Sequence, residues 1–207
     1  MSISQRSIKP PKRRKRSPDE AREEALIAAR ELLLTGGPKA VTLSNVGKAV
    51  GMTHANVIHH FGSASDLQLA LMGSMIADLA AALEDAVAHV RSDEASARAL
   101  VDIVFDAFAN GGAGMLAAWI ALSQDLGRLE TVQDPVQNLV EAILEKIRAQ
   151  DEAARRRITS AVLLIALVAF GDSVIGPPLR QMLGRDDEAA RRVTARLLPV
   201  FFQDTGV

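Results

Sequence analysis

Apolar residues recur at intervals of three and four along most of the chain, and no segment shows the sustained alternation that is typical of a half-buried strand. Ser17-Pro-Asp-Glu20 predicts a helix start, because it supplies the residues of a capping box. Gly36-Gly-Pro38 predicts the end of that helix. Eight more helices are predicted, over about 42–50, 53–61, 63–89, 93–109, 113–126, 134–150, 151–175 and 186–198, with Gly176-Pro-Pro178 as one of the interruptions. The pattern therefore predicts an all-α fold of about nine helices.

Two of the predicted helices are short and are joined by Val50-Gly51-Met52-Thr53, which matches a helix-turn-helix. Gly51 lies where the tight turn needs a positive φ, and Thr42 and Thr53 can cap the two helices. On a helical projection one face of the second helix carries Val57, Ile58 and Phe61, and the opposite arc carries Ala55, Asn56, His59 and His60. Such a short helix with a free polar face fits the major groove of DNA.

Asparagine can pair with adenine, histidine can donate to a base or a phosphate, and alanine can touch a thymine methyl group. Capped helix starts also present hydroxyl and backbone N–H groups to phosphates. The DNA contacts predicted from this unit are Thr42, Ser44, Asn45, Thr53, His54, Ala55, Asn56, His59 and His60. The alternative is an ordinary helical hairpin with a solvated face.

The net charge of −1 hides an asymmetry between the two parts of the chain. Residues 1–62 hold 11 Lys or Arg against 5 Asp or Glu, whereas residues 63–207 hold 13 against 20. Six of the cations lie between Lys9 and Arg16, a run that we expect to be disordered in the free protein. It is interpreted either as a solvated tail or as an arm that follows DNA phosphates or enters a minor groove. The arm contacts predicted are Lys12, Arg13, Arg14, Lys15 and Arg16.

The stretch from Val41 to Phe61 resembles the DNA-binding domain of the tetracycline-repressor (TetR) family, whose pattern runs roughly T-[VL]-x-x-[IV]-A-x-x-A-G-V-S-x-G-x-[LIV]-Y-x-[HY]-F. The matching positions are Thr42, Val46, Gly51, Met52, Thr53, Val57, His60 and Phe61. The resemblance covers about residues 20–70 and implies a homodimeric transcriptional regulator, a repressor that a small ligand releases from its operator. It also implies a division into a basic arm (1–17), a DNA-binding domain (18–66) and a helical ligand-binding and dimerisation domain (67–207).

Three positions depart from the family pattern. Ile58 replaces a tyrosine that commonly contacts a phosphate, Ala55 replaces a glycine, and Ala64 replaces a frequent lysine. Ile58 and Ala64 favour a second hypothesis, a helical ligand-binding or protein-interaction module that has lost specific DNA binding. The basic arm argues against that hypothesis, because its cations can restore the lost phosphate contacts.

The segment from Ala161 to Phe170 is apolar on every side, so we expect its whole circumference to be buried. A second copy of the chain would bury it in a four-helix interface; the alternative is a helix inside a monomeric core. The dimer contacts predicted are Ile158, Val162, Ile165, Ala169, Val193, Leu197 and Val200. A dimer implies a roughly palindromic operator on double-stranded DNA.

A set of methionine, aromatic and leucine side chains at helical spacing could line a cavity for a small apolar effector, although such a pattern is more often simple core. Its members are Met72, Met75, Phe105, Phe108, Met115, Trp119 and Leu122.

Composition excludes several classes of function. The chain has no Cys and four His, and His59 and His60 lie five and six residues after His54, which is not the spacing of a zinc site. No nucleophile–base pair or nucleotide-binding loop is found, so neither a catalytic residue nor a metal or other cofactor is predicted. The longest apolar run has ten residues and no apolar stretch follows the basic start, so we expect a cytoplasmic protein without a membrane span.

Overall fold

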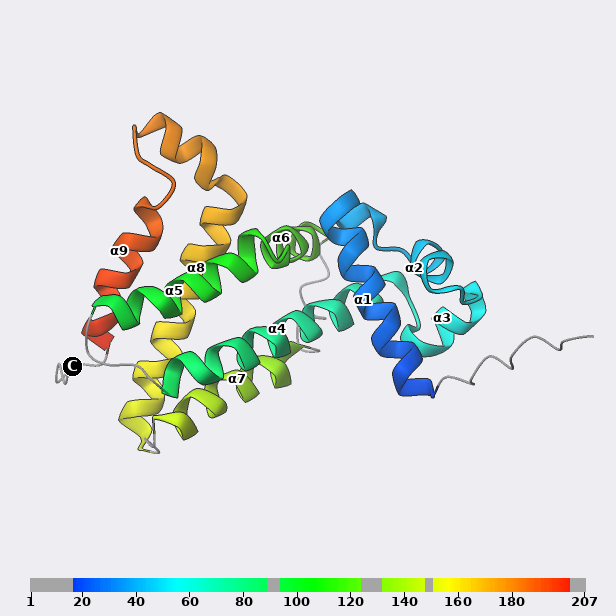
Figure 1. Ribbon diagram of the computed structural model, residues 1–207, viewed down its shortest axis with the longest axis horizontal. Coiled ribbons are helices and arrows are strands. Elements are labelled where there is room, and N and C mark those ends of the chain that lie inside the picture. Colours follow the sequence, from blue (N-terminus) through cyan, green and yellow to red (C-terminus); the bar gives the residue numbers. More distant parts are fainter. Residues whose placement is uncertain (1–16, 89–93, 124–131, 148–150, 202–207) are drawn as a thin grey trace, which may run out of the picture.

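The computed structural model of the 207-residue chain describes residues 17–88, 94–123, 132–147 and 151–201. Regular structure in these ranges is entirely helical, which confirms the predicted all-α fold with nine α-helices. They are α1 (Pro18–Gly36), α2 (Leu43–Val50), α3 (His54–Phe61), α4 (Ala64–Ala88), α5 (Glu94–Ala109), α6 (Ala113–Leu122), α7 (Gln133–Lys146), α8 (Glu152–Met182) and α9 (Ala189–Leu197), with short 3-10 helices η1 (Pro38–Ala40) and η3 (Leu198–Phe201). In Figure 1, α1–α3 gather at one end and α5, α7, α8 and α9 at the other, with α4 running between them.

Local sequence signals explain how the first helices begin and end. The Ser17 hydroxyl accepts from the Glu20 N–H at 3.1 Å and the Glu20 carboxylate accepts from the Ser17 N–H at 2.8 Å, as the capping box predicts. Thr42 and Thr53 cap α2 and α3 through their hydroxyls. Gly51 has φ of 68°, which places it in the left-handed region that the turn requires.

The predicted break at Gly176 is wrong, because α8 continues through Pro177 and Pro178 to Met182. Two prolines remove the hydrogen bonds to the carbonyls of the residues four positions earlier. Both prolines are exposed, so water can reach this side of the helix. An ion pair between Arg180 and Asp172 spans the interruption, and the helix bends towards its end (Figure 1).

The hydrophobic interior continues across residue 66, where the sequence predicts a domain boundary. That boundary stays a prediction. Buried residues of α1, α2 and α3 share one core with the first half of α4 and with α6; they include Ala25, Leu33, Val46, Val57, Leu67 and Leu116. A second core joins the far half of α4 to α5, α7, α8 and α9, through residues that include Leu83, Val101, Phe105, Ile165 and Ala195. Helix α4 therefore belongs to both cores.

Helix α6 is held between the end of α1 and α8. At its N-terminal cap, a Cβ added to Gly112 would lie 3.0 Å from a methyl carbon of Leu34 and 3.2 Å from one of Leu33, both at the end of α1. On its other side a Cβ added to Gly114 would lie 2.9 Å from the Ser173 Cβ of α8. These two glycines let α6 contact both helices closely.

By length and composition alone, two helices could cross a membrane, over Ala64–Glu84 in α4 and Glu152–Met182 in α8, and the bent pair α5–α6 could form a third span. The fold buries the side of each of these helices that packs against the neighbouring helices. On α8, however, Leu163 is 61% and Leu167 is 59% exposed. The single chain therefore covers only part of this helix, and α8 presents an apolar face to its surroundings. The prediction that a second copy covers the rest stays a prediction.

Candidate nucleic-acid interface and apolar cavity

Helix α3 is anchored by two side chains one turn apart. Val57 is fully buried and Phe61 is 7% exposed, and both pack in the core that contains Val46 of α2. The anchor leaves the opposite side of this eight-residue helix free. Of the residues predicted to contact DNA, Ser44, Thr53, His54, Ala55, Asn56 and His59 are exposed, and Thr42, Asn45 and His60 are half-buried. The predicted arm contacts Lys12, Arg13, Arg14, Lys15 and Arg16 lie outside the described residues.

Asn45 has a structural task in addition to its predicted one. Its side-chain amide donates to the Ala40 carbonyl at 3.0 Å, and its backbone N–H donates to the Thr42 hydroxyl at 3.1 Å. These bonds fix the entry of α2 relative to η1. One of the two side-chain N–H groups of Asn45 is thus engaged within the chain.

Ile58 is not on the buried face of α3, contrary to the helical projection. Its side chain is 42% exposed. Successive residues of a helix are rotated by about 100°, so Ile58 lies a quarter-turn from Val57, at the edge of the contact with the core. The interface with α1 and α2 is only wide enough for Val57 and Phe61.

Arg22 of α1 is a functional candidate that the sequence did not reveal. Its guanidinium donates from Nη1 to the backbone carbonyl of His60 at 2.6 Å and lies 4.5 Å from the centre of the Phe61 ring. The last carbonyls of a helix lack partners within it, and a cation there also complements the helix dipole. Arg22 therefore secures the C-terminal end of α3. Its partner is 38 residues away in the sequence, so no local pattern signals the contact.

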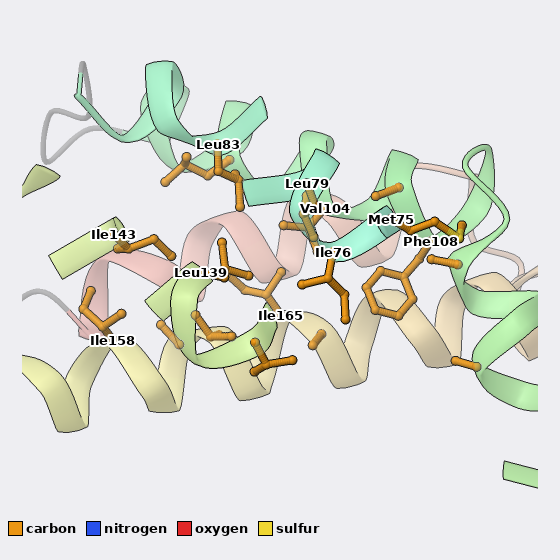
Figure 2. A pocket seen from close by; sticks show the side chains of 18 of the residues that line it. Met75, Ile76, Leu79, Leu83, Val104, Phe108, Leu139, Ile143, Ile158 and Ile165 are labelled. Carbon is orange, nitrogen blue, oxygen red and sulfur yellow. The ribbon is translucent and has the colours of Figure 1, made fainter. Parts of the chain in front are cut away.

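An apolar cavity of about 240 Å³ lies between α4, α5, α6, α7 and α8 (Figure 2). Every residue that lines it is Ala, Val, Leu, Ile, Met or Phe. Three of the predicted ligand residues, Met72, Met75 and Phe108, are among them. Figure 2 shows the side chains of Ile76 and Leu139 turned towards the same space from α4 and α7.

The other four predicted ligand residues do not line this cavity. Phe105 is 2% exposed in the core, with the Arg191 guanidinium 5.4 Å from its ring centre, and Leu122 is 80% exposed. Helix α6 turns Ala113 and Ala117 towards the cavity, and its larger side chains point elsewhere. Met115 is 43% exposed, and its sulfur lies near Gly37. The Lys39 ammonium lies over the Trp119 ring, 5.9 Å from the ring centre.

The chain itself covers the residues predicted as dimer contacts on α8. Ile158, Ile165 and Ala169 are buried in the chain's own cores, and half-buried Val162 lines the cavity. On α9, Val193 is 53% and Leu197 is 47% exposed, whereas the side chain of Val200 lies outside the described residues. The helix is apolar all round, so its sequence could not indicate which face the rest of the chain covers.

An ion-pair network holds α9 against α5. The Arg191 guanidinium donates to Asp106 at 2.7 Å and to Asp102 at 3.2 Å. Burial disfavours the charge on Arg191, but the hydrogen bonds that Arg191 donates to Asp106 and Asp102 outweigh burial and raise the pKa of the guanidinium. The network fixes the orientation of α9 and hence of Val193. Among the described residues, no group of three or more His, Asp or Glu side chains could hold a metal ion.

Residues 25–71 match the family model for bacterial regulatory proteins of the tetR family. A comparison with curated proteins found no match. The fold is similar to the fatty acid degradation regulator FadR of Bacillus halodurans, with 14% identity, a TM-score of 0.59, and coverage of 90% of this chain and 97% of that chain. It is also similar to Thermus thermophilus FadR, a TetR-family transcriptional repressor solved in complex with lauroyl-CoA, with 19% identity, a TM-score of 0.58 and the same coverage.

Replacing Arg22 with Ala should free the last turn of α3. We expect a loss of about 1–2 kcal/mol in the local opening free energy of α3, since the His60 carbonyl loses a charged donor. Hydrogen exchange of the α3 backbone amides measures this loss. Arg30→Ala is the control, because Arg30 pairs with Asp78 between α1 and α4 and does not touch α3. Equal α3 exchange in the two variants would contradict the role given to Arg22.

Proposed function

The chain belongs to the TetR family of DNA-binding transcriptional regulators, and from this premise we propose that it is a homodimeric cytoplasmic repressor that a small apolar effector releases from a palindromic operator. The observation that carries the proposal is α3, whose buried Val57 and Phe61 leave a polar helix face free at the tip of a helix-turn-helix. A helix presented in this way can enter the major groove.

In the proposed complex, Asn56 and His59 contact base edges from the middle of the exposed face, with Ala55 beside them. The cap residues Thr42 and Thr53, together with Ser44, His54 and His60, approach the phosphates that border the groove. The cations of the arm from Lys12 to Arg16 add contacts that do not depend on base sequence. Base readout and phosphate attraction would thus be carried by different parts of the chain.

The proposed dimer uses the uncovered face of α8. Leu163, Leu167, Phe170 and Val174 follow one another at steps of four, three and four residues, and all but half-buried Phe170 are exposed. This spacing is that of a helix–helix seam. Exposed Val193 and Leu197 of neighbouring α9 would extend the contact, and two copies together would form a four-helix interface.

The apolar lining of the cavity favours an uncharged effector, since burying a charged group among side chains without polar atoms is costly. The lauroyl-CoA of the Thermus thermophilus neighbour supports a hydrocarbon chain as the buried part. Helix α6 would couple effector binding in the cavity to the DNA-binding unit. Its Ala113 and Ala117 line the cavity, whereas Met115 and Trp119 of the same helix lie against Gly37 and Lys39, just before α2. An effector that displaces α6 would change the orientation of the DNA-binding unit.

Asn56→Ala or His59→Ala should weaken binding to the preferred operator by about 1–3 kcal/mol and leave binding to random DNA nearly unchanged. Deletion of residues 1–16 should instead weaken binding to all DNA and flatten the salt dependence by about one unit per lost phosphate contact. Fluorescence anisotropy at several salt concentrations measures both. Equal losses of Asn56→Ala on random and preferred DNA would contradict base readout by α3.

Leu163→Glu combined with Leu167→Glu should convert the dimer to a folded monomer, because four charges would meet across the proposed seam. Light scattering after size exclusion gives the mass, and circular dichroism checks the fold. Ile27→Glu is the matched control, since Ile27 is 56% exposed on α1, outside the seam. A wild-type chain that is monomeric at micromolar concentration, or a double variant that remains dimeric, would refute this interface.

Ala117→Phe should fill part of the cavity and abolish the response to an apolar ligand, whereas Ala121→Phe on the exposed side of α6 should not. The probe is 1-dodecanol, and the readout is the emission of Trp119, the only tryptophan of the chain. Wild type should show a saturable change together with release of operator DNA. A response that survives Ala117→Phe would place the effector site elsewhere.

A further inference from the structure

The exposed surface of α3 has two chemically different edges. Asn56 and His59 form a polar edge. Ala55 and Ile58, three residues apart and therefore neighbours on the helix surface, are the apolar side chains of the other edge, where exposed His54 lies one turn before Ile58. Val57 and Phe61 are buried, so Ile58 is the large aliphatic side chain that α3 exposes, at 42%.

Position 58 is well suited to a directional apolar contact. Isoleucine is branched at Cβ and holds essentially one χ1 rotamer on a helix, so little freedom is lost when it meets a surface. Arg22 and Phe61 hold the last turn of α3 from the other side, which makes the helix a firm support. An exposed, rigid aliphatic group beside the polar groups proposed to contact bases is placed to meet an apolar partner in the same groove.

The major groove supplies one such partner. Among the four bases, only thymine presents a methyl group there, at C5, and the side chains that recognise it are apolar. We propose that Ile58 contacts thymine C5-methyl groups and makes this regulator select thymine at the base pairs next to those read by Asn56 and His59. The inference rests on the proposed function, because it requires α3 to lie in the major groove.

This contact would favour thymine on one strand, rather than an A·T pair in either orientation. Burying one methyl group contributes enough to change affinity about fourfold. Each protomer of a dimer would make the contact once, so the effect should occur at two symmetric positions of a palindromic site. Ala55, one turn earlier, is too short to replace Ile58 at the same base but can border it.

The test begins with selection of preferred duplexes from a random pool by the full-length protein. Each thymine of the selected site is then replaced by deoxyuridine, which keeps the base pair and removes only the methyl group. At two symmetric positions of the site, each single replacement should lower the affinity of the wild type about fourfold. Ile58→Ala should bind more weakly to the thymine site and should no longer distinguish the two bases at that position.

Two controls isolate the methyl contact. Ile27→Ala removes an exposed isoleucine from α1 and should keep the discrimination in full. Asn56→Ala should lose affinity yet still distinguish thymine from deoxyuridine. Discrimination that persists in Ile58→Ala, or a wild type indifferent to every replacement, would overturn the inference while the selected site upholds the proposed function. Failure to enrich any sequence would instead refute the proposed function and the inference with it.

Discussion

The burial of Val57 and Phe61 is the constraint on which the nucleic-acid surface depends. An isolated helix of eight residues is not stable in water, so α3 exists because these two side chains are held by α1, α2 and the start of α4. Their one-turn spacing orients the helix, and the orientation decides which residues face outward. Arg22 completes the arrangement by donating to the His60 carbonyl in the last turn of the helix. The polar edge of α3 and the exposed Ile58 are both consequences of this anchor.

The same structure explains how an event in the cavity can reach α3. Helix α4 contributes Leu67 to the core around α3 and Leu83 to the second core, and several of its side chains line the cavity between them. Helix α6 touches α1 through Gly112 and α8 through Gly114. Close-packed interiors transmit displacement rather than absorb it. A ligand among these helices would therefore alter the contacts that position the DNA-binding unit.

Local signals in the sequence were sufficient for much of the fold. The caps at Ser17, Thr42 and Thr53 and the turn at Gly51 depend on nearest neighbours in the chain, and the structure confirms each of them. The face that α8 buries and the exposure of Ile58 depend on the width of tertiary contacts, which periodicity does not contain. The hydrogen bond from Arg22 joins residues far apart in sequence. The continuation of α8 past Pro177 likewise depends on solvent access and on the Arg180–Asp172 pair.

The most direct test is the distance between the two DNA-binding units of the proposed dimer. The chain has no Cys, so Ala49→Cys on the exposed side of α2 gives one spin label per protomer. Pulsed electron resonance should show one narrow distance distribution that shifts when 1-dodecanol binds and stays fixed in a chain that also carries Ala117→Phe. Two results would contradict a dimer whose cavity controls its binding to DNA. One is a distance distribution that saturating 1-dodecanol leaves unchanged in the chain without Ala117→Phe, and the other is the absence of any measurable distance between labels on two protomers.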